Sequence, residues 1–190
     1  MQRIRGRMQL YIPPAATQDT GVETWNAIRS RRDVRDFSER PIDDDHLVRI
    51  LDAGRRAPSA RNWQPWDFVV VTDRAVLVEL AKVFGGASHV GRSAATIALI
   101  APILQEGLEL EYFDLGQATV SMMIAAADLG IGSGHAAVAD QELARKILGH
   151  PDDRFCAHLV PLGYPATRPL FPMRRPRRRP FAEVVHRGRW

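Results

Sequence analysis

The chain has 190 residues, of which 45% are hydrophobic and 25% charged, and its formal net charge at pH 7 is +4. This length predicts one domain that can bury a core without disulfides, and the single cysteine, Cys156, excludes a disulfide framework and a cysteine-only metal site. No apolar run approaches the roughly 20 residues that span a bilayer, and the run at 8–12 is too short for a signal peptide. We therefore expect a cytoplasmic protein with no membrane partner.

Arginine dominates the basic residues, since only two of the 26 are lysine. The arginines gather between residues 29 and 61 and between residues 168 and 189. Arginine suits bidentate contact with phosphate. The net charge is too small to indicate a nucleic-acid partner by itself, so we expect none.

Residues 1–20 contain paired prolines and no periodic pattern, which predicts a mobile N-terminal extension. Residues 21–190 are expected to form a single domain that ends in an arginine-rich tail. Its first helix is predicted over residues 23–32, with Trp25 and Ile28 on one face.

A second helix is predicted to begin after Asp43 or Asp44, either of which is a good N-cap, and to end before Pro58. The segment at 57–66 is expected to be irregular because it holds two prolines. Residues 67–72 are rich in valine and predict a short buried strand.

The rest of the chain alternates helices with short apolar runs. Residues 112–129 form the longest predicted helix, and because it is apolar on all sides we expect it to be a buried central helix at a dimer interface. The order of elements predicts an α+β fold with few strands rather than a regular βαβ chain. The remaining predicted elements are helices at 74–84 and 140–148, strands at 94–101 and 158–162, and a glycine loop at 130–134.

The glycine loop does not match a dinucleotide-binding fingerprint, because its third glycine is one position early and it follows a helix rather than a strand. It is open to two interpretations. It is either the end of a helix with a turn, or a backbone that approaches a flat ligand closely. The six histidines show no metal-ligand spacing, so we expect no metal site.

Two segments carry residue types that suggest ligand binding. The first places Arg31, Arg32 and Arg35 within five residues, where their mutual repulsion requires compensation by neighbouring aspartates or by a phosphate. The second, at 58–66, combines a rigid proline-bounded loop with amide and hydroxyl side chains, which suits a ligand with alternating donors and acceptors. Trp66 in that segment is expected to belong to the core.

Four sequence blocks in this order resemble the flavin-dependent nitroreductase family. They read A-I-x-S-R-R-x-V-R-x-F, A-P-S-A-x-N-x-Q-P-W-x-F, L-G-I-G-S-G and L-G-Y-P, and they span nearly the whole chain after about residue 23. The resemblance implies an α+β fold with a mixed β-sheet flanked by helices. It also implies a homodimer that binds FMN at its interface.

The first block implies that Arg31, Arg32 and Arg35 hold the FMN phosphate. Asp33 stands where the family most often has serine. Because a carboxylate beside a phosphate dianion is unfavourable, we expect Asp33 to pair with a neighbouring arginine.

The second block implies that Pro58 and Ser59 reach the flavin from the other subunit. Asn62 and Gln64 would bond to the ribityl chain or the edge of the ring.

The third block implies that the backbone of Gly132, Ser133 and Gly134 lies against the flavin ring near its reactive N5 atom. Arg177 and Arg179 match the basic pair near the family's C-terminus that returns to the phosphate.

The resulting hypothesis is an FMN-dependent oxidoreductase with ping-pong kinetics. NADH or NADPH would give hydride to flavin N5, and a nitroaromatic, a quinone or a similar acceptor would then be reduced. The flavin, and no catalytic side chain, would carry the chemistry. Two alternatives remain open: a flavin-cleaving, dimethylbenzimidazole-forming enzyme of the same fold, which R-R-D-V-R also resembles, and binding of nucleic acid or an acidic partner through the basic tail.

Overall fold

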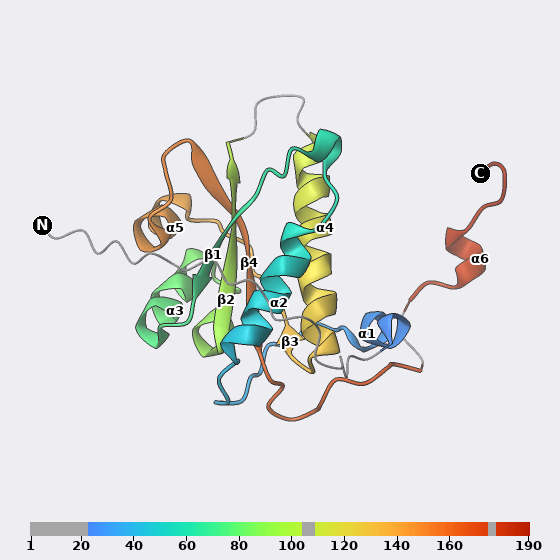
Figure 1. The fold of residues 1–190 in the computed structure, drawn as a ribbon, viewed down its shortest axis with the longest axis horizontal. Helices are drawn as coiled ribbons and strands as arrows, with labels where there is room; N and C mark the ends of the chain where they lie inside the picture. Colours follow the sequence, from blue (N-terminus) through green and yellow to red (C-terminus); the bar gives the residue numbers. More distant parts are fainter. Residues whose placement is uncertain (1–22, 104–108, 175–177) are drawn as a thin grey trace, which may run out of the picture.

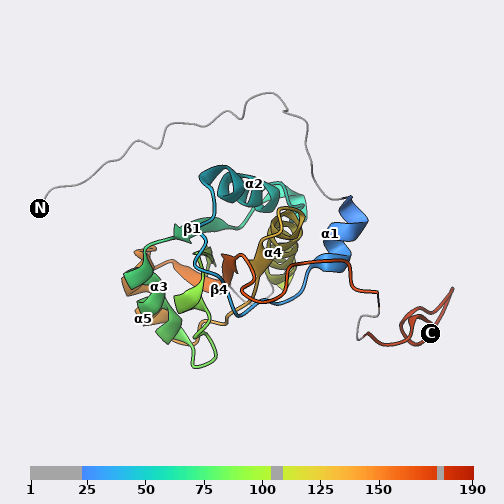
Figure 2. The ribbon, with the colours of Figure 1, turned by 90° about the horizontal axis from the view of Figure 1, so that it is seen from below.

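The computed structural model describes residues 23–103, 109–174 and 178–190, so the predicted extension at 1–20 lies outside the described part of the chain. Within these residues four strands form one sheet, and helices cover both of its faces (Figures 1 and 2). With three short 3-10 helices (η), the elements run α1 (Thr24–Ser30), α2 (Asp44–Arg55), η1 (Ala60–Asn62), β1 (Asp67–Val71), α3 (Arg74–Leu80), η2 (Ala81–Val83), η3 (Val90–Arg92), β2 (Ala95–Pro102), α4 (Glu109–Asp128), β3 (Gly132–Ser133), α5 (Gln141–Leu148), β4 (Arg154–Gly163) and α6 (Phe181–Val184).

The sheet has the strand order β1-β2-β4-β3, and each neighbouring pair of strands is antiparallel. The parallel contact seen in the described residues is one isolated bridge between Asp33 and Ser133. The α+β prediction is therefore confirmed, while the mixed character expected of the sheet is limited to that bridge.

Strands β1 and β2 show what an apolar run can and cannot predict. Alternate residues of β2 face opposite layers, Ile97 and Leu99 toward α2 and α4, and Ala98 and Ile100 toward α3 and α5. Burial on both faces explains its unbroken apolar sequence. Strand β1 has a similar sequence but lies at the edge, where Val71 is its one buried residue, so the prediction of a buried strand there was wrong.

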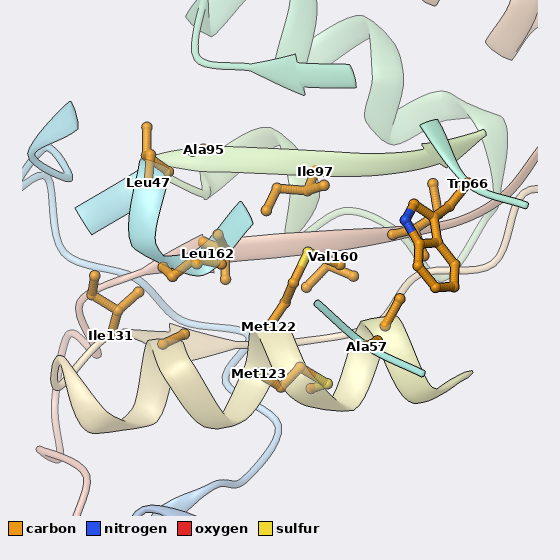
Figure 3. Close-up of a cluster of buried hydrophobic side chains, with 14 of the residues drawn as sticks. Leu47, Ala57, Trp66, Ala95, Ile97, Met122, Met123, Ile131, Val160 and Leu162 are labelled. Atoms are coloured by element: carbon orange, nitrogen blue, oxygen red, sulfur yellow. The ribbon is translucent and has the colours of Figure 1, made fainter. Parts of the chain in front are cut away.

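The larger core layer lies between the sheet and the helices α2 and α4 (Figure 3). Met122 of α4 points toward the sheet, beside Ile97 of β2 and Val160 of β4. A Cβ at Gly54 of α2 would lie 2.7 Å from Cγ of Met122, so glycine is what lets these two helices approach. Trp66 is buried in this layer, as predicted.

Helix α4 is buried on one side only. Tyr112, Phe113 and Val120 are 60%, 66% and 44% exposed. The prediction placed this helix at a dimer interface, and the single chain leaves one of its faces uncovered, so burial by a second copy stays a prediction.

The C-terminal segment leaves the body of the molecule, and α6 stands apart from it in both views (Figures 1 and 2). Phe181 and Trp190 are 73% and 99% exposed. Closer to the body, the backbone N–H of Met173 donates to the Arg29 carbonyl at 3.1 Å, which ties the start of this segment to α1.

In the described residues, no helix combines the length and apolarity needed to cross a bilayer.

Other element boundaries differ modestly from prediction. The first helix ends at Ser30, the helix at 74–84 becomes a 3-10 turn after Leu80, the last strand begins four residues earlier than predicted, at Arg154, and the irregular segment at 57–66 contains the short turn η1.

Candidate functional site

The arginine segment that follows α1 is joined to the glycine loop through its backbone. Helix α1 ends at Ser30, and Arg31 has extended backbone angles (φ −59°, ψ 124°). The N–H of Val34 donates to the Ser133 carbonyl at 2.9 Å, next to the bridge between Asp33 and Ser133. Two segments far apart in the sequence therefore form one continuous wall.

The glycines of the loop are required by packing within the chain. A Cβ at Gly132 would lie 2.7 Å from Cγ2 of Val34, and one at Gly134 would lie 2.8 Å from the Val34 carbonyl oxygen. Gly130 has φ +71° where α4 ends. The helix end with a turn therefore accounts for Gly130, and close packing against Val34 accounts for Gly132 and Gly134.

A buried imidazole supports the glycine loop through a hydrogen bond. His89 is 2% exposed, and its Nε2 hydrogen-bonds to the His135 carbonyl at 3.1 Å. Burial lowers the pKa of His89, which favours the neutral ring. The residue directly after Gly134 is thereby fixed in position.

A hollow of about 290 Å³ lies beside the wall. It is bounded by helix α4 on one side and by the wall and β4 on the other. Its lining residues are Arg31, Gly116, Thr119, Val120, Met123, His135 and His158.

Charged groups meet at one end of this hollow. Asp33 Oδ1 lies 3.4 Å from Arg31 Nη1 and 3.9 Å from His135 Nδ1. The predicted pairing of Asp33 with an arginine is confirmed. Arg31 is about one quarter exposed, so its guanidinium keeps access to solvent and to a ligand.

A second histidine lies deeper in the hollow. His158 Nε2 is 2.6 Å from Thr119 Oγ1, which also donates to the Leu115 carbonyl at 2.8 Å. Burial, with a smaller contribution from His135, lowers the pKa of His158 to about 4. The ring is therefore neutral at physiological pH.

Of the other predicted phosphate ligands, Arg32 and Arg179 are bonded to backbone carbonyls elsewhere in the chain. Arg32 donates to the carbonyls of Arg168 and Pro169, and thus holds the C-terminal segment. Arg35 is exposed. Arg179 donates to the Glu183 carbonyl at 3.0 Å in the protruding tail.

Arg177 lies outside the described residues. Among the described residues, the structure therefore brings together Arg31, Asp33 and residues 132–134, whereas Arg179 is bonded within the tail.

The predicted ligand loop at 58–64 is a tightly bonded, strained turn. Ser59 Oγ accepts from the Gln64 N–H at 2.9 Å, and Gln64 Nε2 donates to the Asn62 carbonyl at 3.1 Å. Arg61, Asn62 and Gln64 have φ of 52°, 57° and 54°. Three consecutive or near-consecutive non-glycine residues with positive φ are unusual, and such strain concentrates at functional sites.

This loop is anchored to α4 on the flank opposite the hollow. The Ala60 N–H donates to Asp114 Oδ2 at 2.9 Å, and Gln117 Nε2 donates to the Pro58 carbonyl at 3.2 Å. Asp114 and Gly116 are two residues apart, which is about 200° around a helix of 3.6 residues per turn. Figure 1 also shows the segment after α2 at the N-terminal end of α4 and β3 at its C-terminal end. Asp114 therefore lies on the side of α4 away from Gly116.

Comparison with known proteins identifies the family. A protein of Archaeoglobus fulgidus named as an NADH dehydrogenase/NAD(P)H nitroreductase is 34% identical over 174 residues, which cover 88% of this chain and 99% of that protein. This chain belongs to the nitroreductase family. The model of the Nitroreductase family also matches residues 28–102, which contain both the arginine segment and the 58–64 loop. The predicted family membership is confirmed, and the protein is an oxidoreductase.

Two further similarities concern the reaction catalysed by a relative and the fold. The 5,6-dimethylbenzimidazole synthase of Rhodospirillum rubrum is 30% identical over 166 residues, which cover 71% of this chain and 78% of that enzyme. A solved structure named as an FMN-dependent nitroreductase from Clostridium difficile aligns with a TM-score of 0.76, 22% identity, and coverage of 86% of this chain and 98% of that one. This second similarity shows the fold alone.

The sequence analysis missed His135, His158 and Thr119 as lining residues of the hollow. One signal was available for His158, because it interrupts an apolar strand at a position where its neighbour Leu159 is fully buried. Nothing in the sequence indicates that Thr119 lies opposite it. In the described residues, no cluster of three or more His, Cys, Asp or Glu could hold a metal ion.

Proposed function

We propose that this nitroreductase-family protein is an FMN-dependent enzyme that takes hydride from NADH or NADPH and reduces a nitroaromatic, a quinone or a similar small acceptor. The observation that carries the proposal is the hollow in which the Arg31 guanidinium meets the wall formed by residues 132–134. The resemblance of the four sequence blocks to the flavin-dependent nitroreductase family supports FMN, and the name of the Archaeoglobus relative supports the nicotinamide donor.

The residues present fit FMN by their chemistry. A guanidinium is the preferred partner of a phosphate dianion, and Arg31 and the exposed Arg35 both follow α1. The hollow, at about 290 Å³, is just below the range of roughly 300–1,000 Å³ typical of ligand pockets. The exposed amides of Asn62 and Gln64 have the donors and acceptors that a flavin edge requires.

When bound, FMN supplies the redox chemistry that side chains lack. The chain's own residues bind FMN and orient it. Arg31 neutralises the phosphate, and His89 keeps the 132–135 backbone in place against one face of the site. Arg32 secures the C-terminal segment, so in this proposal it is a structural residue rather than a phosphate ligand.

We also propose that a second copy of this chain forms a second wall of the site. The exposed apolar residues Trp25, Phe113 and Val120 lie on α1 and on the outer side of α4, and an apolar face of this kind is typical of an interface. A two-fold pairing through α4 would bring the 58–64 loop of one copy to the hollow of the other. The protruding tail, with Phe181 exposed, has the reach to lie on that second copy.

The first test is the absorption spectrum of the purified protein, followed by mass spectrometry of the released chromophore. The proposal predicts about one FMN per chain. Gly116→Leu provides a structural check, because a Cβ at Gly116 meets nothing within 4 Å while a larger side chain would fill the hollow. We expect Gly116→Leu to lose FMN at least about 10-fold and the matched Gly116→Ala variant to fold and bind like the wild type.

Steady-state kinetics with NADH or NADPH and a quinone then test the order of the reaction. Parallel double-reciprocal lines are expected, since the donor and the acceptor would use one position in turn. Intersecting lines would contradict this part of the proposal.

A second candidate function is the oxidative cleavage of reduced FMN to dimethylbenzimidazole. It is favoured by the similarity to the Rhodospirillum rubrum synthase over 71% of this chain. Aerobic incubation of the protein with reduced FMN decides between the two, because only this second function yields a benzimidazole product.

A further inference from the structure

His158 offers one unused hydrogen-bonding atom to the hollow. Its Nε2 is bonded to Thr119 Oγ1, and its Nδ1 has no partner among the described residues. The ring lines the hollow together with Arg31. Among the described residues the fully buried side-chain atom without a partner is His150 Nε2, so His158 Nδ1 is accessible and can bond to water or to a ligand.

Thr119 determines which kind of partner that atom can accept. A threonine hydroxyl has one proton, and Thr119 donates it to the Leu115 carbonyl at 2.8 Å. Thr119 Oγ1 must then accept from His158, so Nε2 carries the ring proton. In a neutral ring the other nitrogen, Nδ1, is consequently an acceptor, and it suits a hydroxyl or N–H group of a ligand.

We propose that His158 is a cofactor-binding residue whose Nδ1 accepts a hydrogen bond from a ribityl hydroxyl of FMN, with Thr119 as the positioning residue that fixes its tautomer. This inference rests on the proposed function. A guanidinium and a neutral acceptor share one hollow, and in FMN a phosphate and a chain of hydroxyls are directly connected. Arg31 matches the phosphate, and His158 matches the hydroxyls.

The surrounding charges agree with this division. Asp33, which pairs with Arg31 and lies near His135, is the acid that faces this end of the hollow. Helix α4 contributes no charge to the lining, since its residues there are glycine, threonine, valine and methionine. A neutral, donor-rich polyol is therefore a better match to the inner part of the hollow than a second anion.

The test measures equilibrium binding of three flavins to the apoprotein by fluorescence: FMN, riboflavin, which lacks the phosphate, and lumiflavin, which also lacks the ribityl chain. His158→Leu is expected to weaken FMN and riboflavin equally, by about 3- to 10-fold for one hydrogen bond, and to leave lumiflavin unchanged. Arg31→Gln is expected to weaken FMN alone. His150→Leu is the matched control, because His150 is a buried histidine in another part of the chain, and it should alter none of the three.

Equal weakening of lumiflavin and riboflavin by His158→Leu would show a packing role and overturn the inference, as would unchanged riboflavin binding. Thr119→Val, which removes the hydroxyl at nearly constant volume, and His158→Gln, which restores an acceptor, decide the matter if His158→Leu does not fold. We expect Thr119→Val to weaken riboflavin selectively and His158→Gln to bind it within about 3-fold of wild type. If the wild-type protein binds none of the three flavins, the proposed function itself fails, a result distinct from any pattern among the variants.

Discussion

The hollow beside Arg31 and the loop at 58–64 are the two regions that the family resemblance assigns to one ligand, and they are built in opposite ways. The hollow is formed by relaxed segments that are joined by backbone bonds, and it presents side chains with unused capacity, such as Arg31 and His158. The loop is strained, and its Ser59 hydroxyl is already used to hold the turn together. The loop can therefore offer mainly the exposed side chains of Asn62 and Gln64.

In the proposed function, the hollow and the loop contribute different groups to ligand binding. The hollow has the charge of Arg31 and a volume of about 290 Å³, whereas the loop presents exposed amide side chains. In this proposal, the hollow of one copy and the loop of another together form the whole site. The rigidity of the loop suits a region that must present its amides to another molecule with little loss of conformational entropy on binding.

The largest effect is expected from reversing the charge of the hollow. Arg31→Glu places a carboxylate where the phosphate would bind, so FMN affinity is expected to fall at least about 100-fold. Arg55→Glu is the control, since Arg55 is an exposed residue of α2 paired with Asp52. Titration of both apoproteins with FMN checks the difference, and a small effect of Arg31→Glu would remove Arg31 from the site.

Acid is expected to lower the free energy of unfolding through the protonation of His158. Its pKa is lowered to about 4 in the folded protein, whereas an unfolded histidine titrates near 6.5, so the unfolded state binds the proton first as the pH falls. The contribution of the neutral His158 ring to the free energy of unfolding is complete above about pH 6.5 and declines toward pH 4. The decline is about 2 kcal/mol between pH 7 and pH 4.5.

Denaturant unfolding at several pH values, with wild type and His158→Leu, measures this decline. The variant should lose less stability than wild type over that window, while His89, whose pKa burial also lowers, contributes equally to both. Identical pH dependence in the two proteins would contradict the burial of a neutral His158.

The strained loop is expected to respond to backbone chemistry instead of charge. Gln64 has φ +54°, and a β-branched residue there adds about 1–2 kcal/mol of strain, so Gln64→Val should be destabilised by about that amount. Gln64→Gly, which tolerates positive φ, should remain as stable as wild type in the same urea titration. If the valine variant matches the glycine variant, the left-handed conformation of this residue does not persist in solution.

The smallest effect is expected at Asp33. Asp33→Ser removes a carboxylate from the Arg31 guanidinium, which then bonds to phosphate without competition, so FMN affinity should rise about 3-fold at low salt. The gain should shrink as salt is added, because exposed charges are screened. Weaker binding by the serine variant would indicate that Asp33 orients Arg31 rather than competing for it.

Local sequence signals predicted the elements that depend on local chemistry. Helix α5 lies where a helix was predicted at 140–148, because Asp140 Oδ1 caps it by accepting from the Leu143 N–H and Gly149 ends it in the left-handed conformation. The strand predicted at 94–101 was also confirmed, as β2. In both cases neighbouring residues in the sequence determine the structure.

The predictions that failed concern residues whose surroundings are set by parts of the chain far away in the sequence. Strand β1 reads like β2 but has a neighbour on only one side, and Arg32 reads like Arg31 but meets the carbonyls of Arg168 and Pro169. His158 acquires its role from Thr119 on another element. Such pairings across the fold leave no mark in a single sequence.

The most direct test of the account is subunit complementation between an Arg31→Glu chain and an Asn62→Ala/Gln64→Ala chain, co-expressed with different tags. Neither variant alone is expected to retain FMN. If each site joins the hollow of one copy to the loop of the other, a heterodimer has one intact site, and a random mixture should recover about one quarter of the wild-type FMN content. Recovery confined to the doubly tagged dimers is the predicted result. No recovery in dimers that do form would contradict a site shared between two copies.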